Sequence, residues 1–150
     1  MKTILVPVDF SAVTVQVART ACEMARLTGA RIVLLHVLPQ VTAFETYGLG
    51  SEIIMETTQA RERIMGRELA ELAKRCSRSV PAVRTVQLTG KAVPAILQQA
   101  KKLKAAYIML GSHGHGAVYD LVTGSVAQGV LRGASCPVFV VPVRPARTRR

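Results

Sequence analysis

Several residue types that would mark particular classes of protein are scarce or missing in this chain. Its 150 residues include no tryptophan and three cysteines, and 4% are aromatic, whereas 49% are apolar. The N-terminal apolar run from Ile4 meets Asp9 after five residues, too few for a signal-peptide core, and no run approaches the roughly 18 apolar residues of a membrane span. We therefore expect one cytoplasmic globular domain, without a membrane partner, whose core needs no disulfide or structural metal.

The cysteines favour neither a metal site nor a redox site. Cys22, Cys76 and Cys136 are widely spaced, form no Cys-x-x-Cys pair and have no histidine at ligand spacing. Buried reduced thiols are the interpretation that fits, because free cysteine behaves as a small apolar residue.

Acidic residues are almost absent from the second half. Residues 1–71 carry seven basic and eight acidic side chains, net −1, whereas residues 72–150 carry thirteen basic side chains and one acidic one, Asp120, net +12. Such a charge run is most often a solvated surface, and it also suits phosphate-bearing ligands or nucleic acid. We expect residues 1–143 to form the domain and residues 144–150, which hold four arginines, to form a basic disordered tail.

Apolar patterning predicts strands that alternate with helices. Five apolar runs have the length and composition of buried strands: Lys2–Val8, Arg31–Val37, Val83–Leu88, Ala105–Leu110 and Pro137–Val143. Between them, helical periodicity covers four segments: a stripe over 13–25 with Ser11 as its cap and Gly29 as its end, a long segment from Ser51 to near Ser79, 93–103 and 125–133. This order predicts an α/β fold with a doubly wound, Rossmann-like parallel sheet and helices on both faces.

Ligands of such sheets bind outside the carboxyl ends of the strands, where the strand order reverses. That rule directs attention to Pro7–Ser11, to His36–Leu38 and to the loop that begins at Gly111. In this loop Gly111, Gly114 and Gly116 leave backbone N–H groups unshielded and allow positive φ. Gly124 and Ser125 then begin a helix, whose first N–H groups attract anions. Both features point to phosphate, although neither a P-loop nor a Gly-x-Gly-x-x-Gly dinucleotide motif is present.

The chain resembles the universal stress proteins, and in particular their nucleotide-binding branch. That branch carries Gly-x2-Gly-x9-Gly-Ser/Thr, which Gly111, Gly114, Gly124 and Ser125 match position for position. Further islands of resemblance occur in the same order along the chain: Val6-Pro7-Val8-Asp9-Phe10-Ser11, Leu35-His36-Val37, Gly90 through Ile96, and Gly124-Ser125-Val126-Ala127 followed by Cys136-Pro137-Val138.

The resemblance implies a five-stranded sheet of order 3-2-1-4-5 that binds ATP, with Mg²⁺ as the accompanying ion. It implies that Pro7, Val8 and Asp9 lie against adenine and ribose and that the backbone of Val37 meets adenine. The residues that it implies for phosphate are Gly111, Gly114, His115, Gly124, Ser125 and Val126. It also implies a homodimer that pairs the last strands, here Val138 to Val143.

One departure from the family pattern weakens the phosphate site. His115 stands where the family often has arginine, and Asp120 adds a negative charge to the same loop. A largely neutral histidine is a weaker phosphate partner than a guanidinium.

No nucleophile with an adjacent base and no pair of carboxylates can be assembled from the loop, so we predict no catalytic residue and at most slow ATP hydrolysis. The predicted function is a nucleotide-dependent regulatory factor in the stress response. Two alternatives stay open: a nucleotide-free dimeric interaction module of the same family, and a basic nucleic-acid-binding protein. The second is disfavoured by the few aromatic residues available for stacking. A third alternative, an ATP pyrophosphatase of the same architecture, is disfavoured. It would need a Ser-Gly-Gly-x-Asp-Ser loop after the first strand, where this chain has Pro7–Ser11.

Overall fold

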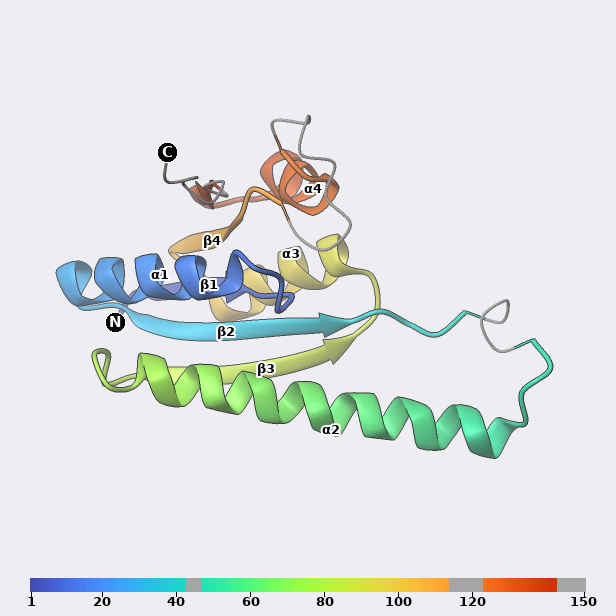
Figure 1. Ribbon diagram of the computed structural model, residues 1–150. Coiled ribbons are helices and arrows are strands. Elements are labelled where there is room, and N and C mark those ends of the chain that lie inside the picture. The colour runs from blue at the N-terminus through green and yellow to red at the C-terminus, as the bar shows by residue number, and fades with distance from the viewer. Residues whose placement is uncertain (43–46, 114–122, 143–150) are drawn as a thin grey trace, which may run out of the picture.

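Five parallel strands form one sheet in the order β3-β2-β1-β4-β5, and four helices connect them (Figure 1). The computed structural model describes residues 1–42, 47–113 and 123–142. The elements are β1 Thr3–Pro7, α1 Thr14–Thr28, β2 Arg31–Leu38, α2 Ser51–Cys76, β3 Val83–Thr89, α3 Ala92–Leu103, β4 Tyr107–Gly111, α4 Ser125–Gly133 and β5 Val138–Val141. The predicted fold class and strand order are confirmed.

Helices cover both faces of the sheet, as continuous apolar strands require. On one face Ile4, Val6 and Ile32 pack with the inner residues of α1 and α2. On the other face Leu5 and Val33 pack with α3 and α4. Residues from the centre of β1 therefore contribute to two cores, and Ile4, Leu5 and Val6 are fully buried.

The two ends of α1 show what local sequence could and could not predict. Gly29 closes the helix at φ 65°, as its position predicted, because glycine adopts that angle without strain. Ser11 does not cap the helix, and that prediction was wrong: Val13 occupies the N-cap position and makes no side-chain cap. The reason is that Asp9 forms a turn first, its Oδ1 accepting the Ser11 N–H at 3.0 Å.

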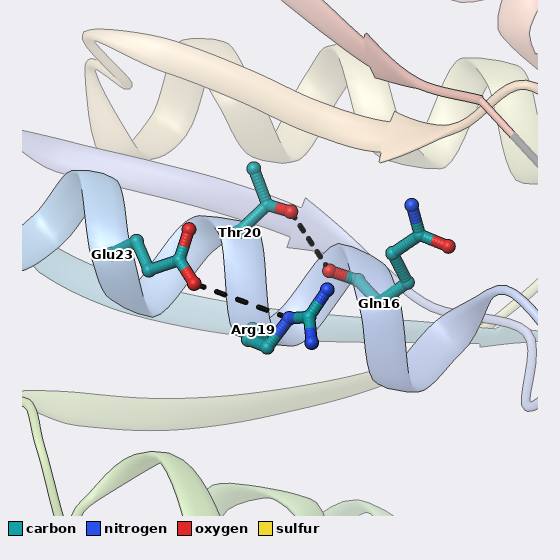
Figure 2. Close-up of polar contacts among 4 residues, drawn as sticks. All are labelled: Gln16, Arg19, Thr20 and Glu23. Atoms are coloured by element: carbon teal, nitrogen blue, oxygen red, sulfur yellow. Dashed lines mark hydrogen bonds and ion pairs between the residues drawn. The ribbon is translucent and has the colours of Figure 1, made fainter.

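The outer surface of α1 is polar, and its side-chain interactions are weak (Figure 2). Arg19 Nε lies 4.0 Å from Glu23 Oε1 one turn along the helix, and the Thr20 hydroxyl donates to the Gln16 carbonyl at 2.9 Å. An exposed ion pair at this spacing contributes only about 0.3–0.5 kcal/mol. The helix is therefore stabilised by its buried face.

The long helix α2 is anchored by its C-terminal half. Leu69, Leu72 and Cys76 are buried against the sheet, whereas Ile64, which shares their apolar periodicity, is 53% exposed. Figure 1 shows that the N-terminal half of α2 runs past the ends of β2 and β3. Residues Glu62 and Gly66, on either side of Ile64, still contact Gln87 of β3, so apolar periodicity alone does not decide which residues of the stripe are buried.

Helices α3 and α4 pack closely because α4 presents two glycines one turn apart. A Cβ on Gly129 would lie 2.7 Å from Val93 Cγ2, and one on Gly133 would lie 2.5 Å from Leu97 Cδ1. The α3 side chains thus fill the space that the two glycines leave.

The pKa of the Cys76 thiol generates a pH prediction. Burial, with the Cys22 thiol against it, raises the pKa of Cys76 from 9.0 to about 12. Because the folded pKa is raised, this group's stabilising contribution is complete below pH 9 and is lost as the pH rises from about 9 to 12. We expect the free energy of unfolding to fall there by up to about 1.4 kcal/mol per pH unit from this group. Urea titrations of wild type and Cys76→Ala at pH 8, 9 and 10 measure it; parallel declines in both proteins would contradict the assignment.

Candidate functional site

The reversal of strand order between β1 and β4 opens a crevice at the carboxyl edge of the sheet. After β1 the chain passes to α1 on one face, and α4 lies on the opposite face. A cavity of about 750 Å³ lies at this edge. Its size is within the roughly 300–1,000 Å³ typical of small-molecule sites.

The residues singled out from the sequence meet in this cavity wherever the structure describes them. Those that line it are Pro7, Val8, Asp9, Val37, Gly111, Gly124, Ser125 and Val126. Gly114 and His115, together with Asp120, fall outside the described residues, as do Val143 and the tail 144–150. Segments more than 80 residues apart in the chain thus form one wall.

Two hydrogen bonds fasten the wall between β1 and β2. The Val8 N–H donates to the Leu35 carbonyl at 2.8 Å, and His36 Nδ1 lies 2.8 Å from the Val8 carbonyl oxygen. Because a carbonyl only accepts, Nδ1 is the donor in this hydrogen bond. His36 is 7% exposed and lies near the end of β2, so it is a buried strand-end histidine.

Phe10, next to this wall but not among the residues that line the cavity, has a strained backbone. Its φ is 59°, in the left-handed region that a bulky side chain rarely occupies, and its ring lies 4.9 Å from the His36 ring. Such a residue costs of order 1–3 kcal/mol and persists because its surroundings hold it. The turn places Asp9, the preceding residue, at the mouth of the cavity.

The Asp9 carboxylate is both a structural and a site group. It is exposed and lines the cavity, while its Oδ1 accepts from the Ser11 N–H and lies 3.5 Å from the Thr14 hydroxyl. The ordering of the turn before α1 therefore also orients this carboxylate.

The opposite wall is the start of α4. The amides of Ser125 and Val126 lie in the first turn, where a helix offers N–H groups that have no acceptor within the helix. The helix dipole adds about half a positive charge at this end. Amides and dipole together make this wall suited to an anion.

Gly124 lets the start of α4 lie close to the backbone of Ser112. Its φ is −68°, a value that any residue can adopt, so its backbone angle does not require glycine. Its N–H donates to the Ser112 carbonyl at 2.6 Å, and a Cβ would lie 3.1 Å from that oxygen. Gly111 is confined in the same way, since a Cβ there would lie 2.6 Å from Val13 Cγ1.

Other lining residues carried no sequence signal for this site. Arg61, Ile64 and Met65 of α2 complete the α1–α2 side of the cavity, and the buried Ser112 places its hydroxyl 3.0 Å from His113 Nδ1. The overhang of α2 beyond the strands brings its residues to this edge, which no local pattern shows.

Metal-ligating residues do not gather in the described part of the chain. Residues 1–42, 47–113 and 123–142 contain no group of three or more His, Cys, Asp or Glu that could hold an ion. Within these same ranges, no helix is both long and apolar enough to cross a membrane.

Comparison with known proteins decides the family. Residues 1–142 match the model of the universal stress protein family. The chain belongs to this family. A universal stress protein of Thermus aquaticus is 31% identical over 140 residues, covering 93% of this chain and 98% of that protein, and one of Methanocaldococcus jannaschii is 30% identical over 93% of this chain and 81% of that protein.

Solved universal stress proteins share the fold. One from Archaeoglobus fulgidus in complex with dAMP has a TM-score of 0.63 at 24% identity, covering 93% of this chain and 97% of its own. Another, in complex with cAMP, has a TM-score of 0.71 at 18% identity, covering 94% and 96%. At these identities the likeness concerns the fold.

Replacing His36 tests how this universal stress protein holds the turn after β1. His36→Phe keeps a ring against Phe10 but leaves the Val8 carbonyl without its donor. An unsatisfied buried acceptor costs about 1–3 kcal/mol, so we expect a loss of that order in the free energy of unfolding by urea. Unchanged stability would show that the hydrogen bond does not hold the turn.

Proposed function

We propose that this universal stress protein binds ATP in the cavity at the carboxyl edge and acts as a nucleotide-dependent regulatory factor. The observation that carries the proposal is the convergence of both walls on one cavity: apolar strand ends on one side, and the amides of α4 on the other. The complexes of family members with dAMP and cAMP support the choice of an adenine nucleotide.

Each part of the nucleotide has a matching group in the proposal. Adenine lies against Pro7 and Val8 and meets the backbone of Val37, and a ribose hydroxyl donates to the Asp9 carboxylate. Phosphates accept from the amides of Ser125 and Val126 and lie against Gly111 and Gly124, with Gly114 and His115 carried over from the family pattern. Mg²⁺ enters with the phosphates, its preferred ligands being phosphate oxygens and water.

The role is that of a sensor. We propose that hydrolysis is slow at most, because the residues of the glycine loop offer no pair of carboxylates. A cytoplasmic location completes the proposal, supported by three cysteines that form no disulfide. Mass analysis of nucleotide released from freshly purified, heat-denatured protein separates an ATP-bound protein from a nucleotide-free interaction module.

Gly124→Val tests the phosphate wall. A branched side chain would meet the Ser112 carbonyl and displace the start of α4 from the cavity. We expect ATP affinity to fall roughly ten- to a hundredfold, about 1.4 kcal/mol for each factor of ten. Ser125→Ala should cost less, because the backbone donors remain. Adenosine, which has no phosphate, should bind both variants almost as it binds wild type.

The matched control for this test is Gly50→Val. Gly50 also precedes a helix at φ −68°, but a Cβ there meets nothing within 4 Å. Calorimetric titration of ATP and adenosine into the four proteins, with circular dichroism to verify folding, gives the comparison. Equal ATP affinity in folded wild type and Gly124→Val would show that this wall does not bind phosphate and would contradict the proposed function.

We also propose a homodimer through β5. This strand forms one edge of the sheet, and Phe139 on it is 42% exposed. An apolar edge with unpaired backbone groups invites pairing, and a second β5 covers it without aggregation. Light scattering at tens of micromolar should give the mass of two chains, and a soluble monomer at that concentration would contradict the pairing.

A further inference from the structure

The edge of the sheet opposite the cavity gathers the positive charge of the chain. All four helices return to this edge, and each has a basic residue in its last turn. The strand starts and short connections at the same edge add more. We name as the basic end its exposed cationic residues Lys2, Arg26, Lys74, Arg75, Arg78, Arg84, Lys101, Lys102, Lys104 and Arg132.

No described glutamate lies in the last turn of a helix at this end, although Glu23 and Glu71 lie one turn before Arg26 and Arg75. The described glutamates all lie on α1 and α2, and the nearest to the basic end along those helices are Glu23 and Glu71, each a turn or more before its helix ends. In the described ranges no residue of the basic end lies within ion-pair distance of a carboxylate. Arg19, by contrast, is paired with Glu23 midway along α1 (Figure 2).

Helix stabilisation accounts for only part of this charge. Each helix C-terminus carries about half a negative charge, so four of them offset about two of the ten cations. Arg78, Arg84 and Lys2 also lie outside the helices. The remaining charge is exposed to solvent and stabilises no helix.

The packing of α3 on α4 holds several of these cations side by side. Gly129 and Gly133 of α4 lie against Val93 and Leu97 of α3, so the two helices run side by side and their C-terminal ends, which carry Arg132, Lys101 and Lys102, face the same edge. Lys101 follows Leu97 by one helical turn, with Lys102 beside it. Arg84 projects on this same face of the sheet, since Val86 and Leu88, in step with it along β3, pack with α3 and α4.

We propose that the basic end binds the phosphate backbone of duplex nucleic acid without sequence preference. A broad surface of unpaired cations suits a uniformly negative lattice of phosphates. Single strands are bound with the help of exposed aromatic rings, but Tyr107 at this end packs edge-on against Phe139 and lies under Lys2 Nζ. The helices meet this surface end-on, so none can lay an amphipathic face into a lipid bilayer.

This surface is separate from the nucleotide cavity. The twelve residues of α3 give it a length of about 18 Å, and it borders the cavity through Ala92 at its first residue, the end opposite Lys101 and Lys102. Binding of duplex and of ATP can therefore be measured and can fail independently.

The test compares two triple variants of the full chain that lose the same charge. Lys101→Gln, Lys102→Gln and Arg132→Gln remove cations of the basic end, while the control removes Arg19, Arg63 and Arg67 by the same change to glutamine. Anisotropy of a labelled 20-base-pair duplex is followed from 50 to 200 mM KCl, and ATP affinity is measured in parallel. Residues 144–150 are the same in all three proteins.

Wild type should bind the duplex with a dissociation constant of about 1–100 µM. The basic-end variant should lose at least about tenfold in duplex affinity while binding ATP normally. The slope of its log affinity against log salt concentration should decrease by the equivalent of about two to three phosphate contacts. The control should change less than about threefold. Equal losses in both variants, no duplex binding by wild type, tighter binding of a single strand, or binding to anionic vesicles in preference to duplex would each overturn the proposal.

Discussion

The central position of β1 is the constraint on which the rest of the structure depends. Ile4, Leu5 and Val6 are fully buried, between α1 and α2 on one side and α3 and α4 on the other. At about 1.5–3 kcal/mol for each buried apolar side chain, the strand cannot shift without loss on both faces. With β2 and β4 as its neighbours, the chain leaves it toward one face while α4 covers the other, and the crevice between them is the candidate site.

The same winding makes the two edges of the sheet chemically different. Because strands run one way and helices return the other way, helix N-termini gather at the carboxyl edge and helix C-termini at the opposite edge. The first edge offers amides to an anion, and the second collects the lysines and arginines that suit helix ends. One topology thus accounts for the nucleotide site that we propose and for the basic end.

Around the cavity, structural and site roles fall on the same groups. Asp9 holds the turn before α1 and faces the opening, and His36 ties that turn to β2 through the Val8 carbonyl. The strained φ of Phe10 is tolerated because its ring packs on His36. A preformed site of this kind lowers the ordering cost of binding, which agrees with the nucleotide binding that we propose.

The sequence by itself determined what depends on a few neighbouring residues. Apolar runs gave the strands, Gly29 the end of α1, and the glycine motif directed attention to residues that line one cavity wherever they are described. Tertiary structure decided what depends on segments far apart in the chain. Gly124 is confined by the Ser112 carbonyl rather than by its own φ, and Ile64 is exposed although it shares the apolar periodicity of the buried residues of α2. The cap expected of Ser11 failed because α1 begins only at Thr14, after the turn that Asp9 orders, with Val13 at the N-cap position. Sequence periodicity predicts which side chains share one face of a helix or strand, but only the tertiary packing decides whether that face is buried and which residues it contacts.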